Sequence, residues 1–318
     1  MVKQGSQIKD ILPFLPKRRI RGLYSRVYAL GLKSGSPRTK HSKNEAFWET
    51  PNPINSYFAG LGAADMSINT TSRFALSWQC HVKDESAMAR FIKETGYTGK
   101  IFYVTEKSPC SENTATHSCL RVSACQKWAI DLSKNFNIVS GKTHRLQPPN
   151  VTSDFLKCCY LIGMTDGDGC ISIGKPQGYQ EMPVVSYVSA SQDIIQWIRD
   201  FVDSKFPFSN RRNPKRGTVN SSVQGTYHHC RIYGMQAIKL FDFLRRIDVP
   251  KFARKWDNPA FLALVETYRQ KWPEFFTPDK ELSFDSAGNI VFASSLVVAP
   301  PPLPTIQPIS LEHSLVLV

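Results

Sequence analysis

The chain has 318 residues, enough for one large domain or two of medium size. Hydrophobic residues make up 42% and charged residues 21%, which is typical of a globular protein and excludes a wholly disordered chain. The net charge of +14 indicates an anionic partner, with nucleic acid as the first candidate and an anionic membrane surface as the second.

Several protein classes are excluded by motifs that the sequence lacks. The eight cysteines have no regular spacing and form no CxxC pair, and no two histidines stand at zinc-ligand spacing, so we expect no disulfide framework and no structural zinc. No apolar run reaches the ~18 residues of a membrane-spanning helix, so we expect no transmembrane helix. Of the two anionic partners we expect nucleic acid and no membrane. No nucleophilic triad and no glycine-rich nucleotide loop is present. We therefore expect a protein of a reducing, intracellular compartment.

The N-terminal region, residues 1–54, is strongly basic, with eleven Lys and Arg against three acids. A helix is predicted over Ile20–Leu32, and Gly35-Ser36-Pro37 ends it. Two interpretations stay open. The region is either a flexible arm or the remnant of a small helical DNA-binding element in which Leu30-Gly31-Leu32 marks a turn.

The middle of the chain contains a repeat. Residues Tyr57–Ile68 resemble Tyr160–Ile171, and aligning Asp65 with Asp168 gives an offset of 103 residues. An offset of this length is typical of domain duplication and too long for a short solenoid repeat. We place the two copies at residues 55–150 and 151–284.

The segments that follow each copy also match. Periodicity and breakers predict strand, helix, strand, strand and helix after each opening helix. In the first copy these are Phe74–Val82, Asp84–Thr95, Lys100–Val104, His117–Ser123 and Gln126–Asn135. In the second they are Val184–Ala190, Gln192–Ser204, Thr218–Val223, His228–Tyr233 and Met235–Arg246. The pattern indicates an α+β protein of two equivalent halves.

The C-terminal region, residues 285–318, has no Lys or Arg and carries five prolines from Pro300 to Pro308. Such a composition predicts an extended, disordered tail.

The repeated helices carry small residues and an acid at matching places. Gly60 and Ala64 in the first copy, and Gly163 and Gly167 in the second, are four residues apart on one helical face, which allows two helix backbones to approach closely. If these helices pack on each other, Asp65 and Asp168 meet at their ends. Two carboxylates at the negative ends of two helix dipoles repel each other, so the pattern favours a divalent cation between them.

The nonamers Phe58–Met66 and Leu161–Gly169 resemble the two copies of the LAGLIDADG motif of homing endonucleases, and the likeness extends over roughly residues 55–270. The resemblance implies two αββαββα repeats with the motif helices at a central pseudo-twofold interface and a DNA-binding sheet in each half. It implies a metal-dependent double-strand cut in a long, asymmetric DNA target by a single-chain, monomeric enzyme. Asp65 and Asp168 would bind Mg²⁺ or Mn²⁺, with the carbonyls of Ala64 and Gly167 as further ligands.

Further residues are candidates for contact with DNA. Lys142 and Lys255 follow the last helix of each half, where basic elements recur in the family, and a lysine there would stabilise charge on a phosphate. Asp166 is interpreted as a helix-end residue beside the site and not as a third ligand. Polar residues of the predicted strands and of one basic loop would contact bases or the DNA backbone. The candidates are Arg73, Gln79, His81, Arg211, Arg212, Lys215, Arg216, His228 and Arg231.

Two departures from the family pattern keep other functions open. Met66 stands where the family prefers Gly, which would cost roughly 1–2 kcal/mol if this residue were left-handed. Ala63 stands where the second copy has Asp166. The alternatives are therefore a decayed, binding-only protein, an intron RNA maturase, or a transcription factor on the same scaffold. An intein is disfavoured, because the chain does not end in a His-Asn pair. The sequence leaves open whether the host compartment is a cytoplasm, a nucleoid or an organelle.

Overall fold

The computed structural model describes residues 41–70, 74–107, 114–175, 181–207, 219–224, 226–277 and 281–292. The predicted helix Ile20–Leu32 and the proline-rich segment lie outside these residues. The chain divides into two compact units, Met1–Lys43 with Gly96–Gly99, and Asn44–Thr95 with Lys100–Val318. In the first unit, the N–H of Thr98 donates to the carbonyl of Ser42 at 3.0 Å. The elements described below belong to the second unit.

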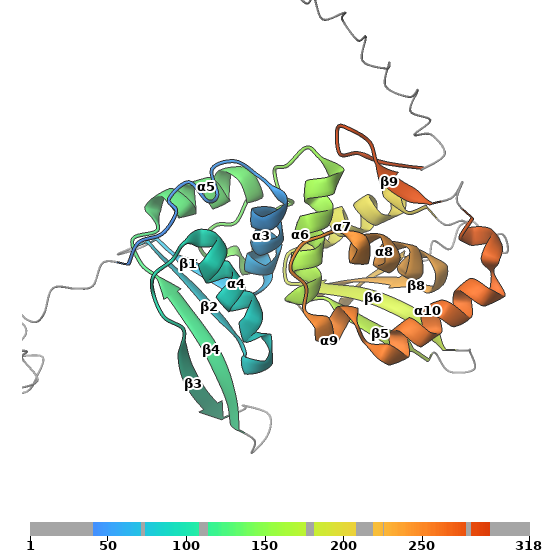
Figure 1. Cartoon of the computed structure of the whole chain (residues 1–318), viewed down its shortest axis with the longest axis horizontal. Coiled ribbons are helices and arrows are strands. Elements are labelled where there is room, and N and C mark those ends of the chain that lie inside the picture. The colour runs from blue at the N-terminus through green and yellow to red at the C-terminus, as the bar shows by residue number, and fades with distance from the viewer. Residues whose placement is uncertain are drawn as a thin grey trace, which may run out of the picture. The chain divides into compact units, whose positions relative to one another are not determined.

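The first repeat is a four-stranded antiparallel sheet with helices against it (Figure 1). Its strands are ordered β1-β2-β4-β3. The elements are α3 (Pro53–Asp65), β1 (Met66–Asn69), β2 (Ala75–His81), η3 (Val82–Asp84), α4 (Glu85–Thr95), β3 (Phe102–Lys107), β4 (Thr114–Val122) and α5 (Gln126–Phe136).

The second repeat has the same plan, with strands ordered β5-β6-β8-β7. Its elements are α6 (Asp154–Asp166), β5 (Cys170–Gly174), β6 (Met182–Ser189), α7 (Gln192–Lys205), β7 (Val219–Gln224), β8 (Tyr227–Tyr233) and α8 (Gly234–Arg246). In both sheets the fourth strand of the repeat lies between the second and the third, so the two topologies are identical. The predicted α+β fold of two equivalent αββαββα halves is confirmed.

Burial patterns explain why one face of each sheet is free. In β2, Leu76, Trp78 and Cys80 are buried while Gln79 and His81 are exposed, which is the period-two alternation of a strand with one covered face. The helices cover the buried face: Met88 and Phe91 of α4 are fully buried, three residues apart. The opposite face of β2 therefore carries exposed polar side chains.

Several short elements follow the repeats. They are η4 (Lys142–His144) after the first and α9 (Ala253–Trp256), α10 (Pro259–Lys271), η5 (Pro273–Phe275), β9 (Leu282–Phe284) and β10 (Ile290–Phe292) after the second. The strands β9 and β10 pair as a hairpin, so the prediction that the extended tail begins at residue 285 is wrong for residues 285–292. The turn is held by Asp285, whose carboxylate accepts from Ala287 N–H and Asn289 N–H, and by Gly288 at a φ of 79°.

Candidate functional site

The helices α3 and α6 lie side by side at the junction of the two repeats (Figure 1). A side chain at Gly60 would overlap the backbone carbonyl of Tyr160, and one at Gly163 would overlap that of Tyr57. Because neither glycine has a side chain, the two backbones touch. A Cβ on Gly167 would likewise collide with Cβ of Ala64, so the C-terminal ends of the two helices stay together.

The N-terminal ends of both helices are fixed by polar side chains. Asn52 and Asn55 form a reciprocal capping box, in which each side chain accepts from the other's backbone N–H, at 3.0 and 2.7 Å. Asp154, the first residue of α6, is buried and accepts from Lys205 at 2.6 Å. Its burial raises the pKa of its carboxyl, but hydrogen bonds from Lys205 and the Ile290 N–H outweigh this and hold that pKa below the usual value.

Asp65 is the last residue of α3, and Asp168 stands two residues beyond the end of α6. Both residues are exposed to solvent, yet protein crowds their carboxylates on several sides. This partial desolvation and the charge of Asp168 raise the pKa of Asp65 to about 6, against the lowering effect of Lys255 and Lys142. Desolvation also raises the pKa of Asp168, while the same two lysines lower it. The two carboxylates therefore share one electrostatic environment.

Lys142 and Lys255 lie on the carbonyl groups that end the two helices. The ammonium of Lys142 donates to the carbonyls of Ala63 and Ala64, at 2.5 and 3.1 Å. That of Lys255 lies 2.6 to 3.0 Å from four carbonyl oxygens, those of Thr165, Asp166, Gly167 and Gly169. Each lysine places a positive charge at the negative end of a helix dipole.

Burial lowers the pKa of both lysines, and the acids around them oppose that shift. The carboxylates of Asp168 and Asp65 raise the pKa of Lys142. The sequence placed these lysines only after the last helix of each half, whereas the structure brings both to the helix ends. The carbonyls of Ala64 and Gly167, named as metal ligands by the resemblance, accept from these lysines in the structure.

A hollow of about 400 Å³ opens beside Asp65. Its lining joins both repeats, with Gln79, His81 and His117 from the first sheet and Phe252 from the segment that leads into α9. Strand register sets His81 directly opposite His117. Of the residues that line it, Asp65, Gly167, Gln79 and His81 were expected at a functional site from the sequence, whereas His117 and Phe252 were not.

Asp84 and Arg254 both line this hollow and form a bidentate ion pair. The Nε and Nη2 atoms of Arg254 each donate to one oxygen of Asp84, both at 2.8 Å. Asp84 is buried and Arg254 is half exposed, so the pair presents part of a guanidinium to the hollow. Sequence reasoning missed it, because the two residues are 170 positions apart and neither belongs to a motif.

Asp166 lines the hollow from beneath, as a buried residue. It is buried, and its carboxylate accepts from the Tyr57 hydroxyl at 2.9 Å, the Phe252 N–H at 3.0 Å and the Trp256 Nε1–H at 2.7 Å. Burial raises the pKa of Asp166 to about 6, although these three donors lower it. A carboxylate with three donors has little capacity left for a cation.

Met66 does not have the conformation that would make glycine necessary. Its φ and ψ are −90° and 147°, so it is extended and continues into β1. The expected strain is therefore absent, and that argument against activity is wrong. Its counterpart Gly169 differs, because a side chain there would collide with the backbone of Thr165, where the chain turns before β5.

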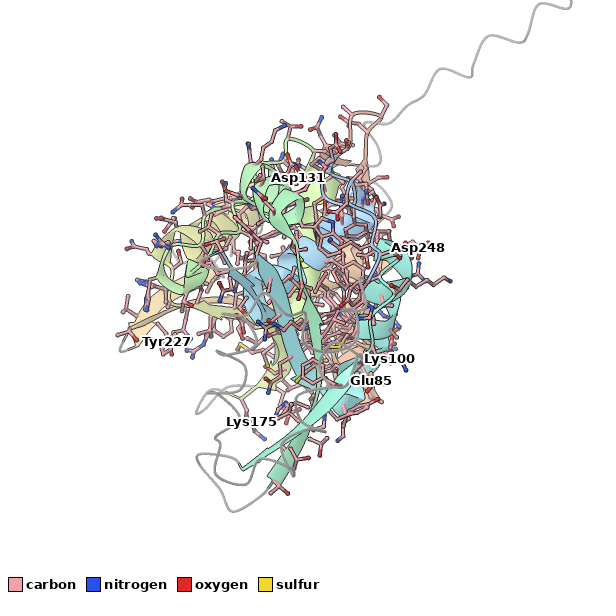
Figure 2. All side chains as sticks on the ribbon, turned by 90° about the vertical axis from the view of Figure 1, so that its left-hand side faces the viewer. Glu85, Lys100, Asp131, Lys175, Tyr227 and Asp248 are labelled. Atoms are coloured by element: carbon pink, nitrogen blue, oxygen red, sulfur yellow. The ribbon has the colours of Figure 1, made fainter. Side chains whose placement is uncertain are left out.

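The candidate DNA-contacting residues fall into two groups. Gln79, His81 and Arg231 are exposed on the free faces of the sheets. His228, paired with Ser189, is half exposed but shares the covered face of β8 with the buried Cys230 and Ile232, so its predicted place on the DNA-binding face is wrong. Tyr227 projects at the outer end of the β7–β8 hairpin (Figure 2). The remaining candidates, Arg73, Arg211, Arg212, Lys215 and Arg216, lie outside the described residues.

The two carboxylates suit a hard divalent cation. Neither Asp65 nor Asp168 makes a hydrogen bond or ion pair of its own with the described residues. Their oxygens are the ligand type that Mg²⁺ prefers, and Mg²⁺ uses few protein ligands together with water and phosphate oxygens. Within the described ranges no group of three or more His, Cys, Asp or Glu gathers as a metal cage. The donor set therefore fits a cation that is shared with a bound phosphate.

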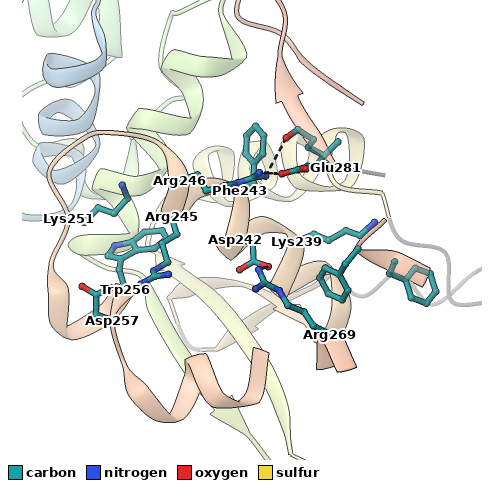
Figure 3. Close-up of a pocket in the computed structure, with 13 residues that line it drawn as sticks. Lys239, Asp242, Phe243, Arg245, Arg246, Lys251, Trp256, Asp257, Arg269 and Glu281 are labelled. Carbon is teal, nitrogen blue, oxygen red and sulfur yellow. Dashed lines mark hydrogen bonds and ion pairs between the residues drawn. The ribbon is translucent and has the colours of Figure 1, made fainter. Parts of the chain in front are cut away.

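A second pocket, of about 710 Å³, lies among α8, α10, η5 and β9 (Figure 3). Several basic side chains line it, and carboxylates pair with its arginines, among them Arg245 with Asp257 at 2.9 Å and Arg269 with Asp242 at 2.7 Å. The paired charges form a structural ion-pair network on the helical side of the second repeat.

No helix among the described residues is long and apolar enough to cross a membrane.

No protein-family model matches the chain, and no curated protein matches it. Among solved structures the chain is similar to the homing endonuclease I-WcaI bound to its DNA recognition sequence, with 10% identity, a TM-score of 0.45 and coverage of 79% of this chain and 97% of that one. It is similar to the I-LtrWI LAGLIDADG homing endonuclease bound to target DNA, with 13% identity, a TM-score of 0.42 and coverage of 74% and 95%.

The chain is also similar to full-length DUF199/WhiA from Thermatoga maritima, with 13% identity, a TM-score of 0.41 and coverage of 73% of this chain and 69% of that one. Similarity of this degree concerns fold and not activity. The duplicated sheet order and the glycine-mediated contact of α3 with α6 give the chain a LAGLIDADG-like fold, as its two motifs predict.

Proposed function

We propose that this protein is a site-specific DNA endonuclease that makes a metal-dependent double-strand cut in a long, asymmetric target. One observation carries the proposal: Asp65 and Asp168 meet at the joined ends of α3 and α6 without partners of their own, and Lys142 and Lys255 lie beside them. Paired carboxylates and flanking cations are the groups that metal-assisted phosphodiester hydrolysis needs.

Each group has a role in this proposal. Asp65 and Asp168 would hold Mg²⁺ or Mn²⁺, which when bound lowers the pKa of a coordinated water and stabilises charge on a phosphate oxygen. Lys142 and Lys255 add positive charge near the same phosphates, and Arg254 adds a third cation at the hollow. The lysines also neutralise the helix ends, which reduces the repulsion between the protein and an approaching DNA backbone.

The free faces of the two sheets would bind the double helix. Their exposed polar side chains alternate with buried ones, as base contacts in a groove require. The two faces are not equivalent, because the pair Gln79 and Cys119 in the first sheet corresponds to Val188 and His229 in the second. An asymmetric target follows, and one chain with both repeats needs no dimer partner.

The second candidate is a protein that binds nucleic acid, DNA or intron RNA, without cutting it. Ala63 favours this candidate, because it replaces Asp166, the acid that in the second repeat binds Phe252 and Trp256. The retention of Asp65 and Asp168 opposes it.

The proposal is tested by selecting DNA duplexes from a randomised pool with the wild-type protein in EDTA, and then adding Mg²⁺ or Mn²⁺. We expect binding that weakens steeply with salt, and cleavage of both strands once the metal is added. Asp168→Asn is the matched control, because it keeps size and removes one charge. It should bind the selected DNA at least as tightly as wild type and fail to cut it.

Three results would contradict the proposal. If Asp168→Asn cuts like wild type, the carboxylates do not act as proposed. If wild type binds DNA with a flat salt dependence, the protein has no nucleic-acid interface of the proposed kind. Binding without any cut by wild type would establish the second candidate.

A further inference from the structure

The carboxylate of Asp166 holds both ends of one short segment, residues 252–256. The Phe252 N–H donates to Oδ2 and the Trp256 Nε1–H donates to Oδ1, at 3.0 and 2.7 Å. These two residues are the N-cap and the last residue of α9. A helix of four residues has little stability of its own, so its place depends on such contacts. The Tyr57 hydroxyl of α3 ties the same carboxylate to the other repeat.

The segment that Asp166 holds carries both cations of this half-site. Lys255 lies on the carbonyls that end α6, and Arg254 reaches Asp84 in the first repeat. Both contacts depend on the position of residues 252–256, whose two ends Asp166 binds. One buried carboxylate therefore connects the helix interface with two cations beside the proposed site.

The first repeat lacks this device. Ala63 is the counterpart of Asp166, and Tyr160 is the counterpart of Tyr57. The Tyr160 hydroxyl is buried and has no hydrogen-bond partner among the described residues, as expected when the acid it would meet is an alanine. Lys142 contacts two helix-end carbonyls, whereas Lys255 contacts four.

We propose that Asp166 is a positioning residue, which orders residues 252–256 and so places Lys255 at the end of α6. Because the first repeat has no equivalent, the two halves of the site are unequally preorganised. Resting on the proposed function, this inference adds that one DNA strand is cut ahead of the other, and that the lead depends on Asp166.

A purely structural role for Asp166 is distinguished by measuring Lys255 itself. Acetic anhydride acylates the neutral amine of a lysine that has left its acceptors, and mass spectrometry gives the rate at each site. Rates measured at several pH values separate a changed pKa of Lys255 from a changed position. We expect Lys255 to react more slowly than Lys142 in wild type. In Asp166→Ala, Lys255 should react about tenfold faster while Lys142 changes little, since three hydrogen bonds to the anchoring carboxylate are lost.

The cleavage readout uses DNA labelled on either strand. In wild type one strand should be cut first, and in Asp166→Ala the ratio of the two strand rates should fall severalfold at saturating DNA, with DNA affinity unchanged. Tyr160→Phe is the matched control, because it removes a hydroxyl that has no partner and should change neither acylation nor strand ratio. Asp166→Asn retains an acceptor for Trp256 and should lie between wild type and the alanine variant.

Trp256→Phe provides a second test in case Asp166→Ala does not fold. It removes one donor to Asp166 and keeps an aromatic ring against Phe241. It too should speed the acylation of Lys255. Unchanged Lys255 acylation in a folded Asp166→Ala protein, or in Trp256→Phe, overturns the positioning role. If wild type cuts no DNA, the proposed function fails separately, and acylation still decides whether Asp166 positions Lys255.

Discussion

Gly60 lies with its α-carbon directly against the backbone carbonyl of Tyr160. Gly62 lies two residues further along the same helix and faces another direction. The atoms nearest to a Cβ added there belong to the flexible Met66 side chain, with Sδ at 3.1 Å. The same substitution at these two glycines should therefore have opposite effects. Gly60→Ala should cost at least about 2–3 kcal/mol, because neither backbone can move aside.

Gly62→Ala should be neutral or stabilise the protein by roughly 0.5–1 kcal/mol, since alanine favours a helix interior. Thermal and urea unfolding of the two variants provide the comparison. Equal stability of Gly60→Ala and Gly62→Ala would show that α3 and α6 do not touch at Gly60.

Tyr57 and Tyr160 offer a second matched pair. Tyr57→Phe removes a hydrogen bond to the buried Asp166 and should cost about 1–3 kcal/mol, because a charged acceptor loses a donor. Tyr160→Phe removes a buried hydroxyl that has no partner and should be neutral or slightly stabilising. Denaturant unfolding of both variants gives the measurement, and a larger loss at Tyr160 than at Tyr57 would contradict the hydrogen-bond pattern.

Periodicity and repetition made the fold readable from the sequence. The helix predicted over Gln192–Ser204 is α7, Gln192–Lys205, because its apolar residues recur every three or four positions and the chain breaks at both ends. The same holds for the strands of both sheets, where alternation is clear. The hairpin β9–β10 was not predicted, because its two strands have three residues each and so few residues show no clear alternation.

The site was readable only where a repeated motif marked it. Asp65 and Asp168 stood out because the motif occurs twice, and the structure sets both at the joined helix ends. The ion pair of Asp84 with Arg254 had no such signal, as it forms only when the two repeats pack together. The anchoring role of Asp166 likewise depends on a backbone N–H and an indole that lie about ninety residues away in the chain.

The Asp84–Arg254 pair should couple the two repeats energetically. A double-mutant cycle of Asp84→Asn and Arg254→Gln isolates the pair, and we expect a coupling energy of about 1–3 kcal/mol, because the bidentate geometry and the burial of Asp84 limit competition from water. The exposed pair of Arg90 and Glu94, at 2.6 Å, is the control and should couple by less than about 1 kcal/mol. Equal coupling in the two cycles would show that the Asp84–Arg254 pair does not join the repeats.

The raised pKa of Asp65 predicts how cation binding depends on pH. A cation binds the ionised carboxylate, so its affinity is full above the pKa of about 6 and falls as the pH drops through it. One pH unit below this value, protonation of Asp65 should lower the apparent affinity for Mn²⁺ by about tenfold. Because the cation and the proton compete, a higher Mn²⁺ concentration should move the midpoint to lower pH.

Calorimetric titration of the DNA-free protein with Mn²⁺ between pH 5 and pH 7.5 measures this dependence. His81 and His117 also line the hollow, and imidazole nitrogens are metal ligands too, so the double variant His81→Gln, His117→Gln should keep the midpoint near 6 if Asp65 is responsible. Asp65→Asn should bind Mn²⁺ weakly at every pH, and the step near pH 6 should disappear. A midpoint near 6 that persists in Asp65→Asn would remove Asp65 from the cation site.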